Sequence, residues 1–154
     1  MPKTWFEMKA AAKTGGAAEI YIYDEIGRWG VSASMFARDL KALGDVSEIT
    51  VRIGSPGGAV LDGFAIYNML KDHKAKKTVR IESYAGSIAS VIAMAGDTVV
   101  MPANTFLMIH NPAAWADGEA ETLRDIADVL DKMRANMIAA YVYKSGQSAE
   151  DVVD

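Results

Sequence analysis

Hydrophobic residues change their spacing several times along the chain, from every second position to every third or fourth and back. Alternating apolar positions rich in β-branched and aromatic residues predict strands over residues 18–23, 48–53 and 78–83. Apolar residues at helical spacing predict helices over residues 34–43 and 60–74. Strands that alternate with helices in this way are typical of an α/β fold.

The second half of the chain predicts shorter strands and one long helix. Residues 84–96 read YAGSIASVIAMAG, a composition that suits a buried helix packed closely against other backbone. Two short strands are expected over residues 98–101 and 105–109. Leucine, isoleucine and methionine then recur every three or four residues over 119–144, which predicts a long amphipathic helix that Gly146 ends.

The last residues predict the start of a further helix. Ser148, followed by Glu150 and Asp151, has the composition of an N-cap and an acidic first turn. A single helical turn is not stable by itself. We therefore expect the sequence to be a piece of a longer protein, with an N-terminal arm over residues 1–16 and one domain over residues 17–154 whose C-terminal part is missing.

The composition indicates a folded, acidic protein. The 154 residues are 51% hydrophobic and 23% charged, which is enough to bury a core, and the formal net charge is -4. A net negative charge disfavours nucleic acid as a partner, because its phosphates attract basic surfaces. Cysteine is absent, which excludes disulfides, thiolate metal sites and a cysteine nucleophile.

No segment predicts secretion or membrane insertion. The longest strongly apolar stretch, residues 83–96, is too short to cross a bilayer. The N-terminus MPKTWFEMKAAAKTGG has no apolar core of the signal-peptide type. We therefore expect a cytoplasmic protein that has no membrane partner. Separately, we expect that it uses no cofactor and no metal.

A glycine-rich run, Gly54-Ser55-Pro56-Gly57-Gly58, lies between a predicted strand and a predicted helix. Its proline fixes φ, and its paired glycines permit positive φ and a close approach of other backbone. Such a run can aim backbone N–H groups at an anion, form the edge of a groove for an extended peptide, or make a tight turn without a ligand. No Gly-Lys-Ser/Thr follows, which disfavours a phosphate-binding loop.

Ser87 lies at another junction between a strand and a helix. Small neighbours permit a sharp turn that projects its hydroxyl, and the N–H of Ile88 at the helix start can bind an oxyanion. This arrangement is similar to a nucleophile elbow, although the G-x-S-x-G motif is absent; the alternative is a serine that only caps the helix. Ser83 and Ser90 are rival hydroxyls, and the place of Ser90 inside the helix favours packing.

Two histidines are available for acid–base chemistry, His73 and His110. His73 lies in the lysine-rich end of a predicted helix, which indicates a solvated residue. His110 follows an apolar strand and begins a loop, where an imidazole can reach a cleft. A hydrogen-bonded structural histidine is the alternative for His110.

Three segments in this order, IGSPGGAVLDGFAIYNML, YAGSIASVIAMAGD and MPANTFLMIHNP, resemble the proteolytic subunit of the Clp protease family, most closely its phage-type head maturation branch. The similarity extends over about residues 17–154. It implies an α/β fold of the crotonase/ClpP-like type, with repeated β-β-α units and the helix from Glu119 as a handle that packs two rings together. It also implies a ring-shaped homo-oligomer that cleaves polypeptides and processes phage head or scaffold proteins in the bacterial host cytoplasm, with an AAA+ unfoldase as a candidate partner.

The resemblance also implies roles for individual residues. The family's nucleophile falls on Ser87 and its general base on His110, while the oxyanion donors fall on the N–H of Gly58, with Gly57 beside it, and of Ile88. Ser87 would attack the scissile carbonyl after His110 takes its proton, and water would hydrolyse the acyl-enzyme. The peptide would lie as an added strand along the segment after Gly57.

Two features depart from the family pattern. The phage branch reads Gly-Leu-Ala-Ala before the serine, where this chain has Ser83-Tyr84-Ala85-Gly86. The family's acid lies about one turn into the element after the handle helix, so the third catalytic residue is Asp154 or an acid beyond it, and Asp151 is the nearer cap.

Three other functions compete with this peptidase. An acyl-CoA enzyme of the crotonase fold uses similar backbone donors but takes its acid–base groups from carboxylates, so Ser87 with His110 favours the peptidase. A Ser–Lys peptidase of the signal-peptide-peptidase type is weaker, because no lysine lies between Lys77 and Lys132. An inactive assembly subunit with the same fold stays open.

Overall fold

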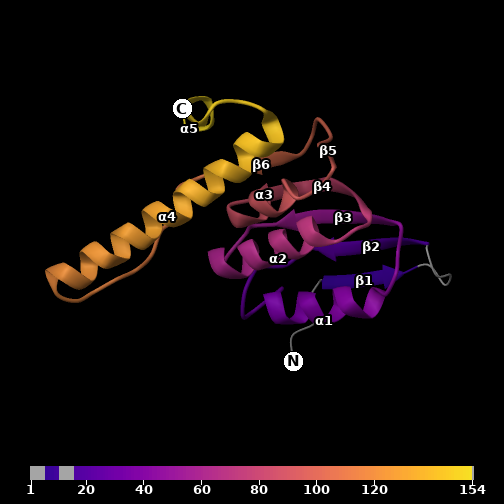
Figure 1. Ribbon diagram of the computed structural model, residues 1–154, viewed down its shortest axis with the longest axis horizontal. Coiled ribbons are helices and arrows are strands. Elements are labelled where there is room, and N and C mark those ends of the chain that lie inside the picture. The colour runs from indigo at the N-terminus through magenta and orange to yellow at the C-terminus, as the bar shows by residue number, and fades with distance from the viewer. Residues whose placement is uncertain (1–5, 11–15, 154) are drawn as a thin grey trace. The chain divides into compact units, whose positions relative to one another are not determined.

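The computed structural model describes residues 6–10 and 16–153. The chain divides into two compact units, Met1–Ile109 and His110–Asp154, and each is described by itself. The elements of the first unit are β1 (Phe6–Ala10), β2 (Ala17–Ile22), α1 (Ala33–Leu43), β3 (Glu48–Ser55), α2 (Val60–Asp72), β4 (Lys76–Gly86), α3 (Ile88–Ala93), β5 (Thr98–Val100) and β6 (Phe106–Met108) (Figure 1).

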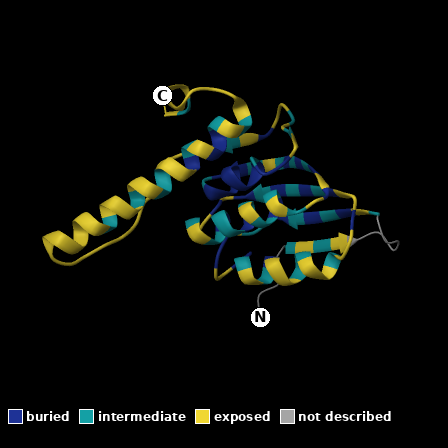
Figure 2. Ribbon diagram, in the orientation of Figure 1, coloured by how far each residue is buried: buried dark blue, intermediate teal, exposed yellow. Residues whose placement is uncertain are grey.

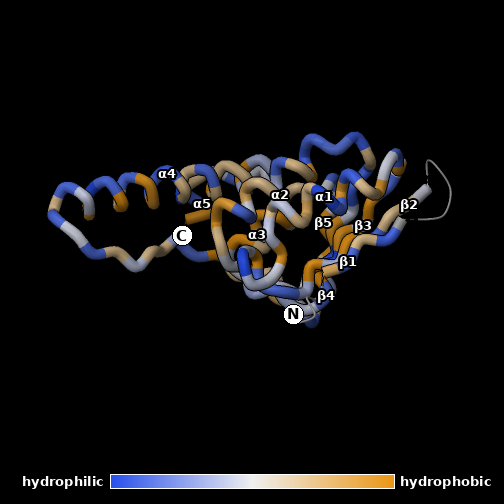
Figure 3. Tube along the Cα trace, turned by 90° about the horizontal axis from the view of Figure 1, so that it is seen from below, coloured by the Kyte–Doolittle hydropathy of each residue, from blue (hydrophilic) through white to orange (hydrophobic). Residues whose placement is uncertain are grey.

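The strands of the first unit form one sheet with the order β1-β2-β3-β4-β5, and β6 pairs with the far end of β4. The pairs β2–β3, β3–β4, β4–β5 and β4–β6 are parallel, while β1 is antiparallel to β2. Right-handed crossovers that move in one direction across a sheet leave their helices on one face, and α1 and α2 lie on the same side of the strands (Figures 1 and 3). The predicted α/β class is confirmed.

Alternation along the strands separates a buried face from a polar one (Figure 2). The inward positions of β2, β3 and β4 carry aliphatic side chains that are buried, and α2 and α3 add further aliphatic side chains to this core. The largest buried side chains in the described part of the unit include Phe36, Ile20, Ile22, Ile53, Ile66, Leu70, Ile81, Ile88 and Ile92.

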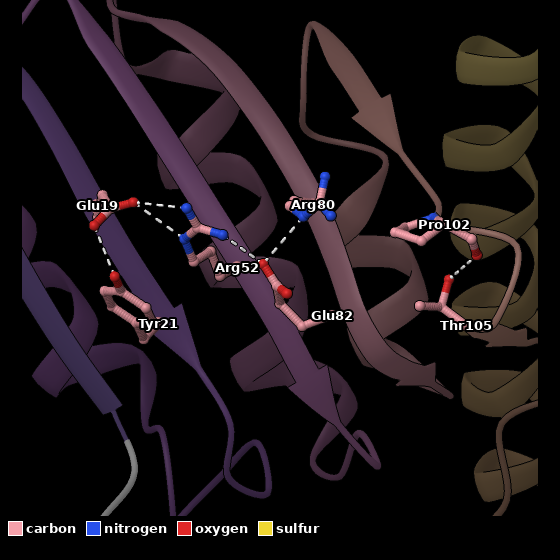
Figure 4. A network of polar contacts seen from close by, with 7 residues as sticks. All are labelled: Glu19, Tyr21, Arg52, Arg80, Glu82, Pro102 and Thr105. Carbon is pink, nitrogen blue, oxygen red and sulfur yellow. Dashed lines mark hydrogen bonds and ion pairs between the residues drawn. The ribbon is translucent and has the colours of Figure 1, made fainter.

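The outward face carries a network of charged side chains centred on Arg52 (Figure 4). The Arg52 guanidinium donates to Glu19 at 2.9 Å and to Glu82 at 2.5 Å, and Arg80 lies 3.3 Å from the same Glu82 carboxylate. The Tyr21 hydroxyl donates to Glu19 at 2.7 Å and, together with Arg52, lowers the pKa of that carboxyl. Because this face is polar and the opposite face is apolar, polar and apolar residues alternate along the strands, and this alternation predicted the strands from the sequence.

Three elements, β1, β4 and α3, differ most from the sequence predictions. Residues 6–10, assigned to an N-terminal arm, form the edge strand β1 of the sheet. Strand β4 extends to Gly86, because its far end pairs with β6, and α3 is correspondingly short, with 6 residues. Before β6, the Thr105 hydroxyl donates to Pro102 O at 2.7 Å and fixes the preceding turn (Figure 4).

The second unit contains α4 (Ala120–Ser145) and α5 (Ala149–Val153). The predicted long helix is present, and hydrophobic patches recur between hydrophilic ones along α4 (Figure 3). Gly146, with φ 71°, ends the helix in the left-handed conformation. Over residues 6–10 and 16–153, the structure has no helix that combines the length and the apolar content of a membrane span.

Candidate active site

Ser87 occupies a strained turn between β4 and α3. Its φ of 52° and ψ of -129° make it the one residue other than glycine with positive φ in the described part of the chain. Such a conformation costs on the order of 1–3 kcal/mol and persists where the surroundings hold it. The side chain makes no N-cap hydrogen bond, so this geometry gives no support to a helix-capping role. A nucleophile elbow has the same kind of strained strand-to-helix turn.

Hydrogen bonds on both sides hold the Ser87 backbone. Its N–H donates to Met108 O of β6 at 2.9 Å. Its carbonyl accepts from the N–H of Ser90 at 3.0 Å and from the Ser90 hydroxyl at 2.5 Å. Ser90 is buried and Ser83 is exposed on β4. The Ser90 hydroxyl therefore braces the turn, as its predicted packing role requires.

Gly57 packs directly against the Ser87 turn. Its φ is 91°, and a Cβ at this position would lie 2.5 Å from Gly86 O and 2.7 Å from Ser87 Cβ. Only glycine fits such a backbone and such a contact. The Gly57 N–H donates to the buried Ser55 hydroxyl at 3.1 Å, and that hydroxyl donates to Asp24 O at 2.7 Å.

The backbone N–H groups of Gly58 and Ile88 have no protein acceptor among the described residues. Gly58 has φ 144° and lies against Ile26 O, where a Cβ would collide. Ile88 begins α3, and the first N–H groups of a helix have no acceptor within the helix. Because the Gly57 N–H points to Ser55, Gly57 contributes close packing, and Gly58 and Ile88 are the available donors.

His110 lies shortly after β6, the strand whose Met108 O accepts a hydrogen bond from the Ser87 N–H. Gly86 is the register partner of Met108, and a single residue, Ile109, lies between Met108 and His110. An extended chain spans about 3.5 Å per residue, so the Cα of His110 lies within about 7 Å of that of Met108. His110 is exposed and begins the second unit.

His73 lies at the end of α2. Its Nδ1 accepts from the Ala75 N–H at 3.1 Å. Burial, followed by the charges of Lys77 and Lys74, lowers the pKa of this imidazole. His73 therefore has a structural hydrogen bond at a helix end, which differs from the solvated state that its lysine-rich neighbours predicted.

The candidate acid Asp154 lies outside the described residues. Asp151 accepts from the hydroxyl of Ser148 at 2.6 Å and from its N–H at 3.2 Å, and these bonds lower the pKa of the carboxyl. The Asp151 N–H donates back to the Ser148 hydroxyl at 3.1 Å, so the predicted cap at the start of α5 is confirmed. Within the described part of the chain, no group of three or more His, Asp or Glu residues could hold a metal ion.

Comparison with known proteins places this geometry in a family. The model of the Clp protease family matches residues 9–154. The chain belongs to the Clp protease family. A solved member, a single-substitution mutant of ClpP1 from Listeria monocytogenes, matches with a TM-score of 0.76 and 27% identity. The match covers 88% of this chain and 76% of that chain.

The predicted family, the ClpP-like fold and the peptidase class are thus confirmed. Membership of the phage branch and the catalytic roles of single residues stay predictions. Within this Clp protease, two groups beside Ser87 were not singled out in the sequence. The first is the Ser55 hydroxyl, which could have been suspected because a polar residue stands at an inward position of β3. The second is Met108 O, a backbone group that nothing in the sequence distinguishes.

Proposed function

We propose that the protein is a serine endopeptidase with Ser87 as nucleophile and His110 as general base. The strained conformation of Ser87 is the observation that carries the proposal, because it is imposed by backbone packing and serves no helix cap. The N–H groups of Gly58 and Ile88 supply the oxyanion site, and Gly57 provides the close contact between the two loops.

The reaction follows the acyl-enzyme route. His110 takes the Ser87 proton while the Ser87 Oγ bonds to the scissile carbonyl carbon, and the developing oxyanion accepts hydrogen bonds from Gly58 and Ile88. The carbon–nitrogen bond then breaks, and the amine leaves with the proton from His110. Water, deprotonated by His110, attacks the ester, releases the acid product and restores the Ser87 hydroxyl.

A third residue would orient the His110 imidazole and stabilise its charged form. Asp154 or an acidic residue beyond it takes this role in the proposal. The bonds of Asp151 to Ser148 support a capping role for Asp151 instead.

The substrate would be an extended polypeptide, bound as an added strand beside the segment after Gly57. We extend the proposal to a ring-shaped homo-oligomer joined through α4, to the processing of phage head or scaffold proteins, and to an AAA+ unfoldase as partner. Leu123 of α4 is exposed, and Ile126 and Leu130, which follow it at helical spacing, are only half-buried; these residues support assembly, since an apolar stripe of this kind is usually covered by another surface.

An acyl-CoA enzyme and an inactive assembly subunit are the competing functions. Both would leave the strained Ser87 without a use, whereas strain of this kind is retained where it serves a mechanism. The test is to treat the protein with a fluorophosphonate, which reacts with activated serines, and to locate the adduct by peptide mass spectrometry. We expect the adduct on Ser87 and cleavage of peptides but not of acyl-CoA thioesters. An unlabelled protein would support the inactive subunit.

A further inference from the structure

The Tyr84 ring rests on Gly86, the residue immediately before Ser87. A Cβ built on Gly86 would lie 2.6 Å from Cζ and 2.7 Å from the hydroxyl oxygen of Tyr84, closer than real Cβ atoms approach. Gly86 is not among the glycines with positive φ. The missing side chain at position 86 therefore makes room for the ring and does not serve an unusual backbone conformation.

The ring contacts the strand at a point where the pairing of the sheet is irregular. The register between β3 and β4 shifts after Ile53, which faces Ile81, so that Ser55 faces Ala85. Two extra residues of β4 are thus accommodated just before the turn, and irregularities of this kind re-aim the chain. Beyond them, Tyr84 and Gly86 lie opposite Phe106 and Met108 of the short strand β6, and Ala85 between them lies opposite Ser55 of β3.

Ser87 needs constraint from every side to keep its positive φ. Hydrogen bonds hold its N–H and its carbonyl, and Gly57 closes one side of the turn. Gly86 has no side chain to restrict its own dihedral angles, and a glycine next to a strained residue offers an easy way to relax it. The Tyr84 ring covers this position.

We propose that Tyr84 is a positioning residue for Ser87: its ring, seated on Gly86, restricts the turn and holds the hydroxyl of Ser87 in its reactive direction. This inference rests on the proposed function, since it assigns Tyr84 a part in the reaction of Ser87. The contact is made by the ring, so Tyr84→Phe should retain activity while Tyr84→Ala should lose it.

The experiment compares Tyr84→Phe, Tyr84→Ala, Gly86→Ala and the double variant Tyr84→Ala/Gly86→Ala, with kcat, KM and the rate of fluorophosphonate labelling measured for each. A displacement of about 1 Å at a reacting group can cost about a hundredfold, so we expect Tyr84→Ala to lower kcat and the labelling rate by about tenfold to a hundredfold, with KM little changed. Gly86→Ala should displace the ring and cause a similar loss. In the Tyr84→Ala background, the same Gly86→Ala change should cost little more, because the new Cβ then has room.

Unchanged kcat and labelling in folded Tyr84→Ala would overturn the proposal. So would a raised KM with retained kcat, because Tyr84 would then contact substrate and not position the nucleophile. If Tyr84→Ala does not fold, Tyr84→Leu and Gly86→Ala provide the same comparison. Amide hydrogen exchange at Ser87, whose N–H bonds to Met108 O, is a readout independent of activity and should accelerate when the ring is lost. If exchange at Ser87 is faster in Tyr84→Ala but the wild type itself is never labelled at Ser87, the proposed function is wrong while the structural effect of the ring stands. If exchange in Tyr84→Ala is the same as in the wild type, the role of Tyr84 is wrong.

Discussion

The backbone N–H of Ser87 donates a 2.9 Å hydrogen bond to Met108 O, and this bond ties the strained turn to the strand that precedes His110. The two candidate catalytic residues are 23 positions apart in the sequence, from 87 to 110. The pairing of β4 with β6 places Ser87 within hydrogen-bond distance of Met108, and Met108 is followed two positions later by His110. Any change that weakens this pairing should therefore affect the reaction of Ser87 before it affects the rest of the fold.

We expect His110→Ala to lower kcat by about 10³ or more, because Ser87 loses the group that takes its proton. His73→Ala is the matched control, since His73 bonds to Ala75 at the end of α2 and has no part in the proposed reaction. Peptide hydrolysis should distinguish the two variants at equal protein concentration. Full activity in His110→Ala would disprove its assignment as the base.

Ser55→Ala should reduce both stability and turnover. The change removes the partner of the Asp24 carbonyl and of the Gly57 N–H, and groups left without partners cost about 1–3 kcal/mol each. The freed Gly57–Gly58 segment should also misplace the oxyanion donor, so that kcat falls more than KM changes. Ser83→Ala, which removes an exposed hydroxyl from β4, should leave urea unfolding and kcat unchanged. If the two variants behave alike, Ser55 does not brace this turn.

Much of the fold could be predicted because the outward face of the sheet is polar. Glu19 and Tyr21 alternate with buried isoleucines, so β2 was predictable to within one residue at each end. The extension of β4 through Tyr84 was not, because it depends on pairing with β6, which lies outside any local window. Strand β1 was missed because its five residues gave only a short alternation beside a lysine- and alanine-rich segment.

The candidate site was predictable in part. Ser87 and the Gly57–Gly58 pair stood out by their places between strands and helices, which local composition reveals. The positive φ of Ser87 and the bond from Gly57 to Ser55 could not be predicted, since both result from two loops that pack against each other. The family resemblance implied donors on Gly58, with Gly57 beside it, and on Ile88, and the hydrogen-bond geometry favours Gly58 and Ile88.

The stability of the protein should fall in mild acid through His73. Its folded-state pKa is lowered by burial and by Lys77 and Lys74, whereas the unfolded imidazole titrates near 6.5. Between these two pKa values the unfolded state binds more protons, so the stability contribution of His73 is complete above about pH 6.5 and decreases as the pH falls toward the folded pKa. Urea midpoints at about pH 7.5 and pH 5.5 should differ more for the wild type than for His73→Gln, which cannot titrate. An equal difference in both proteins would show that His73 is not responsible.

The protein should form a ring-shaped oligomer through α4. Leu123 and Val129 of this helix are exposed, and their burial against another copy would stabilise the assembly. Multi-angle light scattering at micromolar concentration should give a mass of several chains, and Leu123→Glu should lower it. Asp125→Glu, a conservative change at an exposed position of the same helix, should not. A monomeric mass for the wild type would contradict the predicted ring.

The central claim is that Ser87 is the nucleophile, and the most direct test compares Ser87→Ala with Ser90→Ala in fluorophosphonate labelling and peptide hydrolysis. We predict that Ser87→Ala abolishes the label and lowers kcat by about 10³ or more while the unfolding transition stays the same. Ser90→Ala should still be labelled but should unfold more easily, because its buried hydroxyl donates to Ser87 O. Loss of the label in Ser90→Ala together with its persistence in Ser87→Ala would contradict the account.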